Sequence, residues 1–179
     1  MKYILSLGCV IGIILVLVLC GGGMASQEEI VPENYLRIHI RANSNDAVDQ
    51  EVKYKVKDAV VDALIPVLSK CETKAEAVKT LRNNFSLIES VADNVLKANH
   101  FSYTSSARIS NEFFPTRVYE NITLPEGNYD ALILNLGSGE GNNWWCVVYP
   151  AFCFLQSKNS DNVVYISQIW EIIKNILKL

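Results

Sequence analysis

Hydrophobic and polar residues alternate with a period of two near the start of the main body of the chain. The hydrophobic positions are Leu36, Ile38 and Ile40, and the polar positions are Arg37, His39 and Arg41. Because successive side chains on a β-strand point to opposite faces, this segment predicts a strand with one aliphatic and one polar face. The simpler interpretation is that the polar face is in contact with water. The alternative is that these three side chains bind an anion or a carboxylate of a partner, since arginine suits bidentate pairing.

A helical period follows this strand. Turn and cap residues occupy positions 43–46, and hydrophobic residues then recur every three or four positions from Val48 to Leu64. The pattern is typical of a capped amphipathic helix. We expect the helix to end or kink before Pro66, because a proline disfavours helical backbone at the residue that precedes it.

A second helix is predicted from a capping box, in which Thr73 is followed three residues later by Glu76. Ser86 and Glu89 repeat the same signature. The helix therefore either breaks near Ser86 or continues with the same period through Leu96. Both interpretations are compatible with the spacing of the hydrophobic residues.

From residue 100 onward the pattern is that of strands. Alternation over 103–109 predicts a second strand that closes at 113–115, and 116–124 is expected to be extended. Residues 130–136 form a hydrophobic run, and a turn with three glycines at 137–141 separates it from the next run. Two such runs joined by a glycine-rich turn predict a β-hairpin. Further on, 163–166 are expected to form a brief strand.

The second of these runs contains two adjacent tryptophans, Trp144 and Trp145, after the turn residues Asn142 and Asn143. On a strand the two indoles must point to opposite faces, so one of them needs a second layer or lies at the surface. Burial of both within the chain is one interpretation, because large aromatic residues carry much of a core. The other is that one indole and the two asparagines contact a partner, since tryptophan is enriched among interface hot spots.

Together these elements predict an α+β fold with a mostly antiparallel sheet of about four to five strands packed against two to three helices. We expect a single domain over 35–179, preceded by a polar linker at 26–34. The chain should close with an amphipathic helix from Ser167, whose broad apolar face suits burial on the sheet, a membrane surface or a partner.

The first 25 residues consist of one lysine followed by a hydrophobic run over 4–20. Such a segment is an export signal or a membrane anchor, and the small residues that follow it favour cleavage after Ala25. In either case the domain is expected outside the cytoplasm. Loss of this segment leaves 15 basic and 19 acidic residues, a net charge of −4. A nucleic-acid partner is therefore not expected, and Lys53, Lys55 and Lys57 are interpreted as a solvated helix face.

Three cysteines follow the export segment, and an oxidising compartment allows Cys146 and Cys153 to form a disulfide, with Cys71 left over. No metal-ligating spacing and no phosphate-binding loop occur in the sequence, so neither metal nor cofactor is expected. A cysteine nucleophile paired with His39 or His100 is a weaker alternative. The residues alone therefore predict an exported, non-catalytic domain.

Several motifs resemble the stage II sporulation protein R family, from the first strand to Phe154. The motifs are Leu36–Ser44 with Asp49-Gln50, Phe114-Pro115 with Arg117 and Tyr119, Leu124–Gly127 with Tyr129 and Ala131, and Asn143–Val147 with Pro150 and Cys153.

The resemblance implies a protein that the forespore exports into the space between the two septal membranes. Proteins like it activate a membrane-embedded aspartic protease in the mother cell, which processes the precursor of an early sigma factor. The chain would then be a ligand for that protease, without a reaction of its own. The alternatives are an exported cysteine-dependent hydrolase and a structural protein of the septum.

Overall fold

The computed structural model describes residues 31–119 and 122–150. The predicted export segment, most of the linker, Cys153, the brief strand at 163–166 and the C-terminal helix lie outside these residues. The elements in chain order are η1 (Pro32–Asn34), β1 (Leu36–Arg41), α2 (Ala47–Leu68), α3 (Lys74–Asn83), α4 (Phe85–Ala98), β2 (Ser105–Phe114), β3 (Arg117–Tyr119), β4 (Ile122–Leu124), β5 (Gly127–Leu136) and β6 (Asn143–Tyr149).

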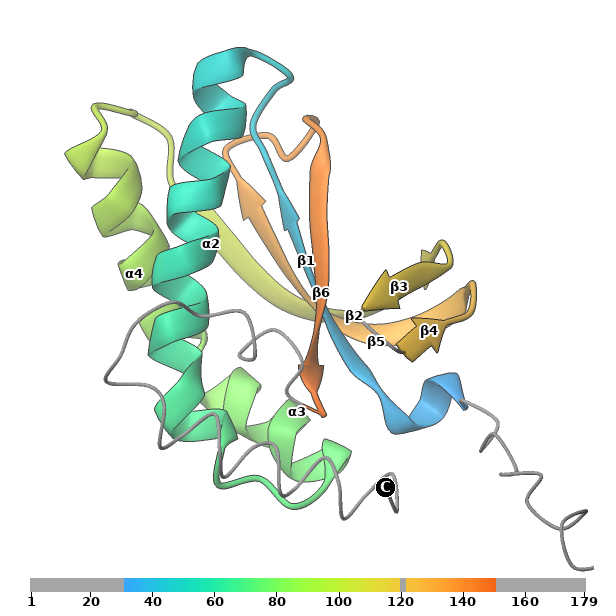
Figure 1. Cartoon of the computed structure of the whole chain (residues 1–179). Helices are drawn as coiled ribbons and strands as arrows, with labels where there is room; N and C mark the ends of the chain where they lie inside the picture. Colours follow the sequence, from blue (N-terminus) through green and yellow to red (C-terminus); the bar gives the residue numbers. More distant parts are fainter. Residues whose placement is uncertain (1–30, 120–121, 151–179) are drawn as a thin grey trace, which may run out of the picture.

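Four strands form one sheet in the order β2-β5-β1-β6, and β3 pairs with β4 in a separate two-stranded sheet. Within the larger sheet, β1 runs parallel to β5, whereas the other two pairings are antiparallel. The three helices lie on one face of this sheet, and the β3–β4 pair stands on its other side (Figure 1). The predicted α+β class, with a mostly antiparallel sheet and two to three helices, is confirmed.

The predicted hairpin between residues 130–136 and the tryptophan strand is wrong. β1 lies between β5 and β6, and it pairs with both of them. The glycine-rich turn therefore spans one intervening strand instead of joining two neighbours. Adjacency in sequence favours a hairpin, but the hydrophobic run at 131–134 in β5 favours a position with a paired strand on each side, and β1 supplies one of them.

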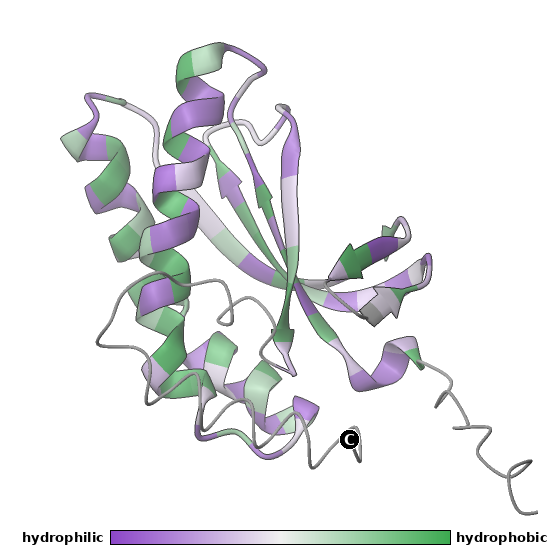
Figure 2. Ribbon diagram, in the orientation of Figure 1, coloured by the Kyte–Doolittle hydropathy of each residue, from purple (hydrophilic) through white to green (hydrophobic). Residues whose placement is uncertain are grey.

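The hydrophobic core lies between the sheet and the helices. Purple and green residues alternate along α2, α4 and the strands in Figure 2, as expected of elements that are buried on one face. The aliphatic positions of β1 are all 0% exposed. On α2 the residues that cover them recur at helical spacing and are almost fully buried, namely Val52, Val56, Val60, Leu64 and Leu68.

Helix α2 does not end before Pro66, so of the two predicted outcomes, an end or a kink, the end is wrong. It continues to Leu68, with the proline inside its last turn. A proline removes one backbone hydrogen bond and crowds the carbonyl four residues earlier. Near a helix end that cost is limited, and the burial of Leu64, Ile65 and Leu68 holds the last turn against the core.

Helix α3 begins as the capping box predicts. The Thr73 hydroxyl accepts a hydrogen bond of 3.2 Å from the Glu76 backbone amide, and the Glu76 carboxylate accepts one of 2.9 Å from the amide of Glu72. Of the two interpretations for the following segment, the break is correct. The break falls at Asn84, which lies between the last residue of α3 and the first residue of α4.

The glycine-rich turn is hydrogen-bonded to the loop that follows β1. The Gly141 amide donates to the Ala42 carbonyl at 2.8 Å, and the Ser138 hydroxyl donates to the Asn43 carbonyl at 2.7 Å. Space is tight at this junction: a Cβ on Gly141 would lie 2.1 Å from the backbone oxygen of Ser44. A backbone atom held in a hydrogen-bonded loop cannot move away cheaply, so this position requires glycine.

The substitution Gly141→Ala should therefore lower the free energy of unfolding by about 1–3 kcal/mol, the usual cost of overpacking a filled site. Gly127→Ala is the matched control, because a Cβ there would meet its nearest atoms at 3.7 and 3.8 Å. We expect that variant to stay within about 0.5 kcal/mol of the parent. Urea unfolding measures both. Equal stability of the two variants would contradict the assigned junction.

Candidate interaction surface

The polar positions of β1 lie on the face of the four-stranded sheet that is opposite α2, α3 and α4, called here the far face. Residues paired across a sheet share a face, so the register identifies the other side chains on it. They are Ser106, Arg108, Ser110 and Glu112 of β2, Tyr129, Ala131, Ile133 and Asn135 of β5, and Asn143, Trp145 and Val147 of β6.

Arg37 is fully buried, so the prediction that the polar face of β1 is in contact with water is wrong at this residue. Its guanidinium carbon lies 4.3 Å from the centroid of the Phe114 ring and 5.0 Å from that of Tyr129. Its Nη2 donates a hydrogen bond of 2.7 Å to the Tyr119 hydroxyl, whereas Nε and Nη1 have no hydrogen-bond partner among the residues that the structure describes. Ring faces thus supply most of the electrostatic compensation that a carboxylate usually gives.

Burial lowers the pKa of the Arg37 guanidinium, and the adjacent Tyr119 opposes this effect. Arginine keeps its charge in proteins, because its ordinary pKa lies far above neutrality. The same burial raises the pKa of Tyr119, although the guanidinium counteracts it. The pair is therefore a charged donor and a neutral phenol. The hydrogen bond between them connects β3 to β1, a central strand of the four-stranded sheet.

His39 is also buried, at 6% exposure, and its Nδ1 lies 3.2 Å from Glu112 Oε2. The same carboxylate oxygen accepts a hydrogen bond of 2.6 Å from Arg41 Nη2, and the other oxygen lies 3.2 Å from Arg108 Nη2. Burial is the main cause that lowers the pKa of His39, and the positive charge of Arg41 lowers it further. The imidazole is therefore neutral at pH 7. Glu112 is shared by three side chains and links β1 to β2.

The two tryptophans point to opposite faces, as the strand periodicity predicts. Trp145 pairs with His39 and lies on the far face, where the Arg117 guanidinium carbon is 4.4 Å from its ring centroid. Trp144 pairs with Ile40 on the helix face, with Lys57 Nζ 5.8 Å from its ring. Both indoles are half-buried.

Asn142 and Asn143 are exposed, as expected of turn residues. The Asn142 amide donates to Asn45 Oδ1 at 2.7 Å, and its carbonyl accepts a hydrogen bond of 3.0 Å from Lys53 Nζ. Lys53 is only 1% exposed, so its predicted place on a solvated helix face is wrong. Its ammonium group is held by neutral oxygens of this junction, and burial lowers its pKa.

Cys146 and His39 do not form one of the two nucleophile pairs that the alternative considers. Cys146 pairs with Ile38 and points to the helix face, whereas His39 lies on the far face. Cys71 is a buried free thiol. Cys153 lies outside the described residues, so its predicted disulfide with Cys146 stays a prediction.

Residues 31–119 and 122–150, which the structure describes, contain neither a cluster of metal-binding side chains nor a helix that could span a membrane. Among them no group of three or more histidine, cysteine or acidic side chains could hold a metal ion. In the same part of the chain no helix is both long and apolar enough to cross a membrane.

Sequence reasoning missed four residues that complete the far face. Glu112, Phe114 and Tyr129 lie on strands that were expected, and Arg117 lies on the short β3. The alternation of polar residues at Ser106, Arg108, Ser110 and Glu112 was a usable signal for the first of these. Nothing local indicated that β3 would bring Arg117 to Trp145, 28 positions along the chain.

The fold and the far face define a small α+β domain in which charged and aromatic side chains gather on one side of the sheet. The model of the stage II sporulation protein R family matches residues 32–159. The chain belongs to the stage II sporulation protein R family, and it is therefore a sporulation protein.

A relative in Bacillus subtilis (strain 168), stage II sporulation protein R, is 31% identical over 138 residues. The match covers 77% of this chain and 62% of the relative, so it spans less than two thirds of that protein. No solved structure matches the chain.

The buried, neutral His39 predicts a specific pH dependence. Its pKa is lower in the folded than in the unfolded chain, so the unfolded chain binds the proton more readily. The free energy of unfolding should consequently fall as the pH drops from about 7.5 to 5.5, across the ordinary histidine pKa. His39→Gln should flatten this dependence, which urea unfolding at several pH values measures.

The other histidine of the chain, His100, provides the control. It is exposed and has a φ of 65°, so asparagine, which tolerates that backbone conformation, is the suitable replacement. His100→Asn should keep the pH dependence of the parent. An unchanged slope in His39→Gln would show that His39 does not stay neutral in the fold.

Proposed function

We propose that this chain is an exported sporulation signal, which acts from the forespore side of the septum on a membrane-embedded aspartic protease. The protease would then process the precursor of the early mother-cell sigma factor. The chain itself would be a ligand and not an enzyme. Membership of the stage II sporulation protein R family supports this proposal. The hydrophobic N-terminal segment in the sequence supports export.

The observation that carries the proposal is the pairing of Trp145 with Arg117 on the far face, with centroid and guanidinium 4.4 Å apart. Arg41, whose side chain is 27% exposed, and the exposed Asn143 flank this pair in the register of β1 and β6. Tryptophan and arginine are the side chains most enriched at interface hot spots. A half-buried indole held by a cation offers a rigid contact that loses little entropy on binding.

Arg37 is 0% exposed, so it does not contact a partner in the proposed complex. Its role is to position the residues of this surface. Its hydrogen bond to Tyr119 holds β3, and β3 carries Arg117. Val118 on the same short strand is 67% exposed and adds an apolar contact. The β3 residues therefore belong to the proposed contact surface together with Trp145.

Activation by a ligand requires differential binding. The domain must bind the active, assembled state of the protease more tightly than the idle state, since a ligand with equal affinity for both shifts nothing. A tenfold preference corresponds to about 1.4 kcal/mol, which one hot-spot residue commonly supplies. Loss of a single anchor on the far face is therefore enough to weaken activation measurably.

We predict that Trp145→Ala lowers cleavage of the sigma-factor precursor by about tenfold or more. Trp144→Ala should change cleavage by less than about twofold at equal amounts of folded chain, since its indole lies on the helix face. The assay co-expresses the exported chain, the protease and the precursor in a host that does not sporulate. The measured quantity is the ratio of mature to precursor sigma factor.

Secretion and folding are checked for both variants by the amount of protease-resistant chain outside the cytoplasm. Arg117→Ala should behave like Trp145→Ala, because it removes the other half of the pair. Normal processing with Trp145→Ala at parental levels of folded chain would exclude this surface. Processing that does not depend on the chain at all would exclude the proposed function itself.

A further inference from the structure

Strand β2 is an edge of the four-stranded sheet, and half of that edge is already capped. It pairs with β5 without a break in register from Ser105 to Phe114. On its other side, the Ser105 amide donates to Asp93 Oδ1 at 2.7 Å and the Ala107 amide donates to Glu89 Oε1 at 2.8 Å. Two carboxylates of α4 thus occupy the outward donors at the start of the strand.

Because backbone groups alternate in direction along a strand, the next outward donors and acceptors belong to Ile109, Asn111 and Phe113. No residue that the structure describes accepts a hydrogen bond from the outward backbone amides of these three residues. Two of these three residues, Asn111 and Phe113, are exposed, with Phe113 at 65%. This half of the edge can therefore accept another strand.

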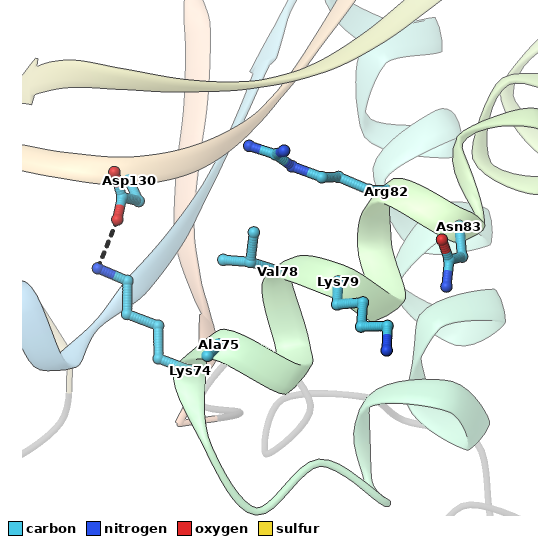
Figure 3. A pocket seen from close by; sticks show the side chains of 7 residues that line it. All are labelled: Lys74, Ala75, Val78, Lys79, Arg82, Asn83 and Asp130. Atoms are coloured by element: carbon cyan, nitrogen blue, oxygen red, sulfur yellow. Dashed lines mark ion pairs between the residues drawn. The ribbon is translucent and has the colours of Figure 1, made fainter.

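A hollow of about 630 Å³ lies beside this half of the edge. Its lining comes from α3 and β5, namely Lys74, Ala75, Val78, Lys79, Arg82, Asn83 and Asp130. In Figure 3 Val78 and Arg82 extend from α3 toward the strand that carries Asp130, whereas Lys79 points away from it. The Asn111 amide group donates to Asp130 Oδ1 at 3.1 Å, which ties the edge strand to the hollow.

The charge of the hollow is positive. Among the described residues that line it, Asp130 is the only acidic one, and Lys74 already pairs with it at 2.7 Å. Lys79 and Arg82 make no ion pair with the residues that the structure describes. Asn111 and Phe113 point to the same face of the sheet as Asp130, according to the register of β2 and β5. An exposed ring, outward backbone groups and cations without an ion pair to the described residues thus occur together.

We propose that β2 is a docking edge for an extended, acidic segment of a partner protein, which adds to the sheet as a fifth strand. Its backbone would pair with the outward groups of Ile109, Asn111 and Phe113, and the acidic side chains on its helix-side face would meet Arg82. Backbone pairing supplies affinity in this mode of recognition, and the side chains on alternate positions supply specificity. The aromatic ring of Phe113 would cover an apolar side chain of the segment.

A second copy of the chain is the less suitable occupant. Two β2 edges paired about a twofold axis would bring the same cations toward one another, which opposes self-association. An acidic strand would instead bring negative side chains toward these cations, which favours association. The proposal also goes beyond the protease hypothesis, because β2 and β6 lie at opposite edges of the sheet, and Trp145 belongs to β6.

The test uses the full-length chain in mild detergent and a fluorescein-labelled heptapeptide in which glutamate and valine alternate. Anisotropy should show saturable binding of this peptide and at least about fivefold weaker binding of the same peptide with lysine in place of glutamate. Hydrogen exchange measured with the glutamate peptide should slow at Ile109, Asn111 and Phe113.

Two matched pairs of variants assign the binding to this edge. Asn111→Pro removes an outward amide without breaking the ladder to β5, and it should weaken binding about fivefold or more, whereas Asn111→Ala keeps the amide and should bind within about twofold. Arg82→Glu should weaken binding to a similar extent. Lys97→Glu, an equal change of charge at an exposed site on α4, should not.

Equal binding by Asn111→Pro and Asn111→Ala, or by Arg82→Glu and Lys97→Glu, would overturn the proposal. Full protection of the three amides before the peptide is added would also overturn it, because the edge would then be covered by the chain itself or by a second copy. Sedimentation distinguishes these two cases. None of these readouts depends on the protease, so the outcome is separate from that of the sigma-factor assay.

Discussion

The pairing of β1 with strands on both of its sides is the constraint on which the rest of the structure depends. β1 lies about 90 residues before β5 and more than 100 residues before β6 in the sequence, yet it forms a ladder with each of them. Loop closure over such distances costs entropy before any contact forms. The loop after β1 helps to offset this cost, because its backbone and side-chain oxygens accept hydrogen bonds from the glycine-rich turn.

A strand in the middle of a sheet has little access to water, and this explains the state of its polar residues. Arg37 and His39 belong to a strand with neighbours on both sides, so their side chains can only reach partners that other strands bring above them. For Arg37 these partners are the rings of Phe114 and Tyr129 and the hydroxyl of Tyr119. A buried cation of this kind destabilises the fold unless its partners are held in place. It therefore fixes where β3 can lie, and β3 in turn carries Arg117 to Trp145.

The sequence allowed the local structure to be predicted, because local structure depends on local chemistry. The cap at Thr73, the period of β1 and the opposite directions of Trp144 and Trp145 all follow from residues that are close along the chain. The hairpin was predicted wrongly because pairing partners are chosen by the whole sheet. Likewise, the period of two predicts that Arg37 and Leu36 point to opposite faces. It does not predict that aromatic residues more than 75 positions away cover Arg37.

The two halves of the β2 edge differ in how they satisfy their outward backbone groups, and this difference has consequences for association. Carboxylates of α4 cap the first half of β2, which protects it from pairing with other chains. The second half has cations beside it instead of caps. Positive charge next to a free edge opposes pairing with an identical edge, and it does so without occupying the amides and carbonyls. In the proposed complex the same charge would favour a strand that carries negative side chains, so protection from self-association and selection of an acidic partner would both arise from the position of Arg82.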